Sequence, residues 1–255
     1  MYLLATNPIL AFAAIIPAII LIVKIYKADK VDKEPIRLLV SLVILGIIST
    51  AIALVLEEVG SGLLGLFFKE NSLAYNIIMY FGVVACSEEG AKYILLKKRT
   101  WRSKEFDYLF DGVVYAVCVS LGFALWENIG YVAKFGISVA LLRAVTAVPG
   151  HACFGVFMGI YYGIAKMFDN RHNEGRSKSF RNKAFWVPVF MHGLYDFLAS
   201  SKSTFSGLGF LVFIIFMFVY ARSLVKRQSK ADVNIQQVMP PEGLFNNQND
   251  NDKYN

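Results

Sequence analysis

Seven long apolar runs dominate the sequence and limit what the chain can fold into. They cover residues 3–23, 36–56, 73–96, 113–132, 137–165, 184–199 and 205–220. A helix needs roughly 20 mainly apolar residues to cross a bilayer, and most of these runs reach or approach that length. Charged residues make up only 18% of the chain, against about 25% in a typical soluble domain. We therefore predict an all-α, polytopic transmembrane helix bundle with about seven spans.

The basic residues of the chain are concentrated in every second loop. The loops after the first, third and fifth runs and the end of the seventh hold most of the Lys and Arg, whereas the intervening loops hold only Lys69, Lys134 and Lys202. Because cytoplasmic loops carry the excess of basic residues, we expect the N-terminus outside and the C-terminus inside. This distribution explains the net charge of +7 without a nucleic-acid partner.

The chain reads as one membrane domain, residues 1–227, followed by a polar segment. Residues 228–255 are rich in Asn, Asp and Gln, a composition typical of disorder, so we predict a disordered cytoplasmic tail. Residues 57–71 contain three glycines among apolar residues, and we expect this segment to lie along the membrane interface. The three cysteines all fall inside predicted spans and are interpreted as small apolar fillers.

Six ionisable side chains stand inside the predicted spans, where charge is costly. They are Glu88, Glu89, Glu127, His151, His192 and Asp196. A charged carboxylate at the centre of a spanning helix costs at least ~2.5–3.5 kcal/mol on insertion scales. These residues come from four different runs, so we expect them to face the interior of the bundle and to meet in one polar cluster.

The spacing of the polar residues supports this convergence. Residues four apart share one face of a helix, which places Lys92 beside Glu88 and Asp196 beside His192. The Pro149-Gly150 dipeptide directly precedes His151. We expect the fifth span to break there, since a broken helix is tolerated where it lines a cavity.

This set of residues suits the hydrolysis of a peptide bond. A buried glutamate can act as the general base that activates a water, and a histidine can stabilise the oxyanion. No cofactor is required by that chemistry. Alternatively, His151, His192 and Glu89 would hold Zn²⁺, whose bound water would be the nucleophile. The HExxH motif of the usual zinc proteases is absent from the sequence.

The polar motifs resemble those of the PrsW family of membrane proteases. They read Glu88-Glu89-Gly90-Ala91-Lys92, Phe123-Ala124-Leu125-Trp126-Glu127-Asn128, His151-Ala152-Cys153-Phe154-Gly155 and His192-Gly193-Leu194-Tyr195-Asp196, in this order. The family is distantly related to the CAAX prenyl proteases and to bacteriocin-processing membrane proteases. Glu127 occupies the position where CAAX-type relatives place a histidine, which favours a glutamate-based mechanism.

The resemblance implies an intramembrane endopeptidase in a bacterial cell membrane, acting on a membrane protein substrate such as an anti-sigma factor. In this interpretation Glu88 or Glu89 activates the water, Glu127 and His151 assist the base, and His192, oriented by Asp196, stabilises the oxyanion. Lys92 and Asn128 are predicted to support the site.

Other interpretations stand beside this one. Intramembrane carboxylates and histidines also build the proton relays of transporters, and a non-catalytic membrane chaperone or immunity protein could retain the motifs. Glu57-Glu58 is interpreted as an acidic pair at a helix end. Arg143 either binds a lipid phosphate or pairs with Glu127.

Overall fold

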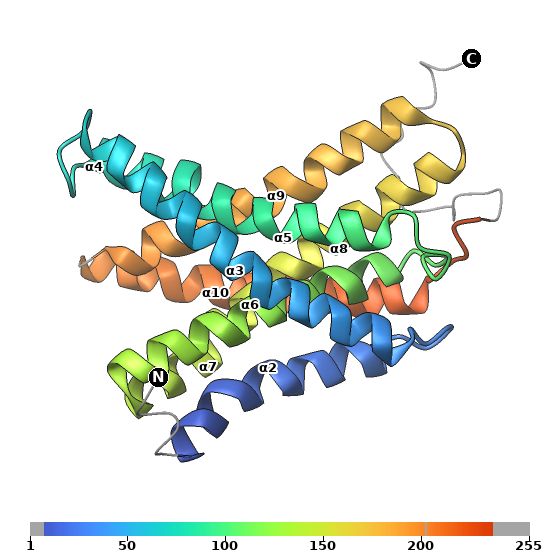
Figure 1. The fold of residues 1–255 in the computed structure, drawn as a ribbon, viewed down its shortest axis with the longest axis horizontal. Coiled ribbons are helices and arrows are strands. Elements are labelled where there is room, and N and C mark those ends of the chain that lie inside the picture. Colours follow the sequence, from blue (N-terminus) through green and yellow to red (C-terminus); the bar gives the residue numbers. More distant parts are fainter. Residues whose placement is uncertain (1–7, 202, 237–255) are drawn as a thin grey trace.

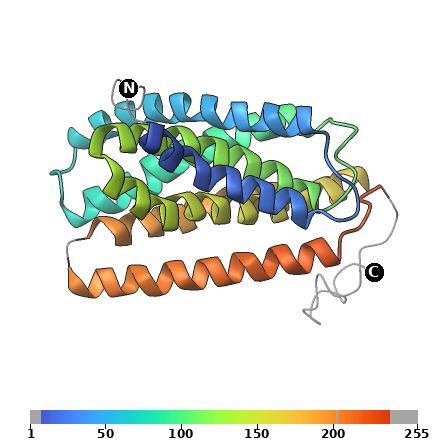
Figure 2. The same ribbon diagram turned by 90° about the horizontal axis from the view of Figure 1, so that it is seen from below.

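The computed structural model describes residues 8–201 and 203–236, and its long helices run roughly along one common direction (Figures 1 and 2). The elements are α2 (Pro8–Ala28), α3 (Ile36–Gly65), α4 (Leu73–Ile77), η1 (Ile78–Val84), α5 (Ala85–Thr100), α6 (Asp111–Phe135), α7 (Ile137–Val145), α8 (Ala147–Asn170), α9 (Glu174–Ser200) and α10 (Thr204–Lys230). The described residues form no strand, only one isolated bridge between Tyr108 and Asn234. The all-α prediction is therefore confirmed.

The described part of every predicted span falls within a helical segment, and residues 3–7 of the first span lie outside the described residues. Within the described residues, five segments are long and apolar enough to cross a membrane: α2, α3, α6, α10 and the segment formed by α7 and α8 together. Helices α5 and α9, which carry the two glutamates and the His192–Asp196 pair, are not among these five. Helix α5 has only 16 residues, and α9 contains many charged and polar residues. The count of seven spans and the orientation of the termini remain predictions.

Two of the predicted boundaries differ from the structure. Helix α3 continues to Gly65, so residues 57–65 extend a spanning helix and do not form a separate interfacial segment. The break in the fifth span lies at Thr146, between α7 and α8, and not at Pro149-Gly150. Proline in the first turn of a helix loses no backbone hydrogen bond, so Pro149 is accommodated where it stands.

Helices α6 and α8 form the core of the bundle. Nearly every residue in the first half of α6 is buried, from Asp111 to Ala124. Gly155, Gly159 and Gly163 recur every fourth residue of α8 and face α6. A Cβ atom on Gly159 would lie 2.4 Å from the Cα atom of Val113. Small residues at such spacing let two membrane helices approach closely.

Helices α3 and α6 cross at a second glycine contact. A Cβ atom on Gly46 would lie 2.1 Å from the carbonyl oxygen of Val119, and one on Gly122 would lie 2.2 Å from that of Val43. Beyond this crossing the two helices diverge, so that their C-terminal ends lie far apart (Figure 1). The divergence leaves room between their second halves, which is where the candidate site lies.

The residues after α10 are packed against the loop that precedes α6. The amide of Ile235 donates to the carbonyl of Asp107 (2.7 Å), and the Ile235 side chain is buried. Residues 228–236 therefore differ from the predicted disordered tail, because they are paired with this loop. Residues 237–255 lie outside the described part of the chain.

The glycine contact between α3 and α6 can be tested by adding one methyl group. Gly46→Ala forces the Cβ atom against the α6 backbone, so we expect a loss of roughly 1–3 kcal/mol in unfolding free energy. Gly62→Ala on the same helix is the matched control, since no atom lies within 4 Å of its Cβ position. Unfolding in detergent, followed by circular dichroism, measures both. Equal stability of the two variants would contradict the close contact.

The loop before α3 predicts a pH dependence of stability. Burial raises the pKa of Glu34 to about 7 from its usual 4.5. The folded state then holds a proton that the unfolded state releases, so the unfolding free energy falls as the pH rises from about 4.5 to 7. We expect Glu34→Gln to reduce the fall of the melting temperature over this range, and burial of Asp29 in the same loop leaves part of that fall in place. Glu58→Gln, at an exposed position, keeps the wild-type slope. An identical slope in wild type and Glu34→Gln would refute this.

Candidate active site

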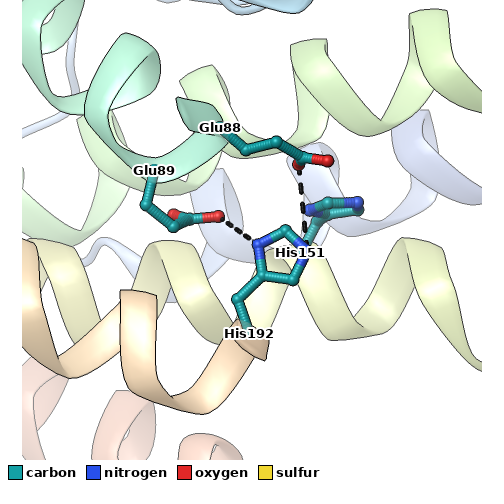
Figure 3. A group of neighbouring side chains, drawn as sticks. All are labelled: Glu88, Glu89, His151 and His192. Carbon is teal, nitrogen blue, oxygen red and sulfur yellow. Dashed lines mark hydrogen bonds and ion pairs between the residues drawn. The ribbon is translucent and has the colours of Figure 1, made fainter. Parts of the chain in front are cut away.

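The structure brings the six predicted ionisable residues into one connected cluster. Glu88 and Glu89 come from α5, Glu127 from α6, His151 from α8, and His192 and Asp196 from α9. Figure 3 shows both glutamates and both histidines pointing toward one another from three helices. Regular α-helix is interrupted at two places near the cluster. The π-helical segment η1 precedes α5, and the break at Thr146 lies about one turn before His151. Such departures are frequent at functional sites.

Lys92 lies at the centre of the cluster with its side chain fully buried. Its Nζ atom lies 3.0 Å from Glu88 Oε2, 2.8 Å from Glu89 Oε1 and 3.3 Å from His151 Nδ1. It also lies 3.8 Å from the centre of the Phe123 ring. The ammonium group therefore links both carboxylates of α5 to the histidine of α8, instead of extending toward the membrane surface.

These contacts define the tautomer of His151. An ammonium group has only donors, so Lys92 donates to Nδ1, and Nε2 must carry the ring proton. Nε2 then donates to Glu127 Oε2 at 2.9 Å. Arg143 Nη2 pairs with the same oxygen at 2.8 Å. Of the two partners that the sequence allowed for Arg143, a lipid phosphate or Glu127, the structure shows Glu127.

His192 is held from both sides of its ring. Its Nδ1 atom donates to Glu89 Oε1 at 2.9 Å. Its Nε2 atom lies 3.4 Å from Asp196 Oδ2 and 3.9 Å from Glu88 Oε2. The ring of Phe154 stacks on the imidazole with a centroid distance of 4.6 Å. The orienting partner on Nδ1 is therefore Glu89, whereas the predicted orienter, Asp196, is on the opposite nitrogen.

A cavity of about 620 Å³ opens beside the cluster. Glu88, Glu127, His151, His192 and Asp196 line it, whereas Glu89 and Lys92 do not. The two adjacent glutamates thus differ in position relative to the cavity. Glu88 is accessible to a water or substrate in the cavity. Glu89 lies outside the lining and accepts hydrogen bonds from Lys92 and His192.

Two residues differ from what the sequence suggested. Asn128 donates to the carbonyl of Ala14 in α2 and accepts from Arg143 Nε, so it braces the bundle and does not face the cavity. Glu57 lines the cavity and is not merely half of an acidic pair at a helix end. The signal was its spacing: Thr50, Leu54 and Glu57 share one face of α3, and all three line the cavity.

The donor atoms of the cluster match a divalent metal in kind. One ligand atom each from Glu88, Glu89, His151 and His192 lie within 4.8 Å of one another, and Zn²⁺ takes histidine nitrogen and carboxylate oxygen. However, Lys92 already contacts three of these four residues, and its ammonium would repel a metal ion at the same place. The arrangement therefore fits a buried ammonium and does not fit Zn²⁺ while Lys92 stays where it is.

The importance of Lys92 can be measured by removing its charge at constant length. Lys92→Met leaves Glu88 and Glu89 without their shared partner, so we expect a loss of about 3–5 kcal/mol in unfolding free energy. Combining it with Glu89→Gln removes one uncompensated charge and should recover part of the loss. Lys98→Met is the control, because Lys98 is exposed on the same helix. Wild-type stability of Lys92→Met in a detergent unfolding assay would contradict this role.

Comparison with known proteins gives a consistent result. Residues 34–222 match the family described as PrsW family intramembrane metalloprotease. The chain is 35% identical to Protease PrsW of Oceanobacillus iheyensis, over 86% of this chain and 95% of that protein. It is 31% identical to Protease PrsW of Bacillus subtilis, over 89% and 97% of the two chains. No solved structure matches significantly. From the extent of these matches, the chain belongs to the PrsW family.

Proposed function

We propose that the chain is an endopeptidase of the cell membrane that cleaves membrane-bound protein substrates with a water activated by Glu88. The observation that carries this proposal is that Glu88, Glu127, His151 and His192 all line one cavity. The names of the relatives support a protease. An anti-sigma factor as substrate rests on the family resemblance alone.

The proposed reaction uses four polar residues that line the cavity, Glu88, Glu127, His151 and His192. Glu88 takes a proton from the water, whose oxygen attacks the carbonyl carbon of the scissile bond. His192, protonated on Nε2 and held at Nδ1 by Glu89, donates to the oxyanion. Protonated Glu88 then gives its proton to the leaving amine as the C–N bond breaks. The neighbouring Glu127–His151 pair orients the substrate and assists proton transfer.

The direction of the cavity suggests where a substrate would be cut. Its lining includes Tyr131, near the end of α6, and Ser200, at the end of α9. These helix ends lie away from the basic loops. If the basic loops are cytoplasmic, the cavity opens toward the outer side, and we propose that the cut falls in the outer part of the substrate's span.

The test is cleavage of single-span membrane proteins by the purified protein in detergent. Glu88→Gln keeps the shape of the side chain but cannot accept the proton, so we expect the rate to fall about 10²–10⁴-fold. Glu58→Gln, on an exposed position of α3, should cleave at the wild-type rate. Wild-type cleavage by a folded Glu88→Gln variant would remove Glu88 as the base.

The same assay with a strong zinc chelator separates the two mechanisms. Cleavage that survives chelation supports the glutamate mechanism. Cleavage that is lost and then restored by added metal would mean that Lys92 leaves the cluster and that His151 and His192 act as ligands. If the wild-type protein cleaves no substrate, uptake into liposomes tests the transporter alternative.

A further inference from the structure

A second cavity lies on the opposite face of α8 from the candidate active site. Its volume is about 480 Å³, within the range of pockets that bind small ligands. Helices α2 and α10 flank it (Figure 2), and α6 and α8 form its floor. We call it the α2–α10 groove. Its lining on α8 includes Pro149, Ala152 and Cys153. These residues belong to the same turn of α8 as His151 but lie on its other face.

The α2–α10 groove combines a long apolar surface with two cations. Lys24 and Arg222 are its only charged lining residues, and the other lining side chains are apolar. Among the described residues, neither cation is paired with a carboxylate. The groove therefore offers two cations within an otherwise hydrocarbon-like surface.

The position of the two cations along their helices matters for the kind of ligand. Lys24 lies about one turn before the end of α2, and Arg222 about two turns before the end of α10. Both ends belong to the basic side of the bundle. Side chains at such positions extend toward lipid headgroups, and basic pockets between membrane helices on the cytoplasmic side bind anionic headgroups.

We propose that the α2–α10 groove binds one anionic phospholipid. Its phosphate lies between Lys24 and Arg222, and an acyl chain lies against Ala152, Cys153 and Val156 of α8. A zwitterionic lipid such as phosphatidylcholine would bring its own cation beside Lys24 and Arg222, and a small soluble anion would leave the apolar floor exposed to water. This inference does not rest on the proposed reaction, because it concerns the opposite face of α8.

The experiment measures lipid retention by the full-length protein. Protein in nanodiscs of equal phosphatidylglycerol and phosphatidylcholine is released into native mass spectrometry, and the bound lipids are counted. We expect selective retention of phosphatidylglycerol, lowered about tenfold in the Lys24→Gln/Arg222→Gln variant. Lys27→Gln/Lys226→Gln is the matched control, since it removes two exposed charges from the same helices outside the groove lining. It should change retention less than about twofold.

A third variant tests the apolar part without changing the charge. Ala152→Phe fills the groove next to the acyl chain, so it should also lower phosphatidylglycerol retention about tenfold, and its circular dichroism spectrum checks that it folds. Equal losses in the groove pair and the control pair would overturn the site in favour of general surface attraction. Equal retention of the two lipids by the wild type would overturn headgroup recognition. Displacement of the lipid by millimolar inorganic phosphate would indicate a simple anion site.

Discussion

The buried ammonium of Lys92 is the interaction on which the arrangement of the site depends. Two adjacent carboxylates inside a membrane bundle repel each other and lose hydration, and each is costly when unpaired. Lys92 lies within 3.0 Å of both and also donates to His151. Among the described residues it makes the direct hydrogen bonds that join the carboxylates of α5 to the histidine of α8.

From Lys92 the polar contacts extend through five helices. His151 donates a hydrogen bond to Glu127 of α6, and Glu127 forms an ion pair with Arg143 of α7. In the other direction Glu89 fixes His192 of α9. Each group therefore has a donor or acceptor whose direction follows from its neighbour. Such networks give a defined geometry in a medium of low dielectric constant, as water activation and oxyanion binding require.

Apolar packing decides where this network can form. The glycine contacts hold α6 against α8 and against α3, and beyond the crossing at Gly46 the helices separate to leave the cavity. The same α8 turn faces the candidate active site through His151 and the α2–α10 groove through Ala152 and Cys153. Packing on one face of α8 is thereby connected with the position of the histidine on the other.

The PrsW-type motifs and the helical fold could be predicted from the sequence because hydrophobic run length and the cost of intramembrane charge are local properties. Those properties were enough to select all six ionisable residues, and the i, i+4 spacing was enough to pair Glu88 with Lys92. The loop charges predict on which side of the membrane each terminus lies. The structure does not test that orientation.

The sequence could not predict that Glu88 and not Glu89 lines the cavity, that Glu57 also lines it, or that Asn128 is buried against α2. Adjacent residues on a helix point about 100° apart, and which of them meets the cavity depends on how α3, α5, α6 and α9 pack. The buried position of Lys92 could not be predicted either. A lysine near a helix end can also extend to the membrane surface. The sequence alone determined which residues must avoid lipid, and only the tertiary structure decided which of them face a substrate, because facing is set by packing between helices distant in the chain.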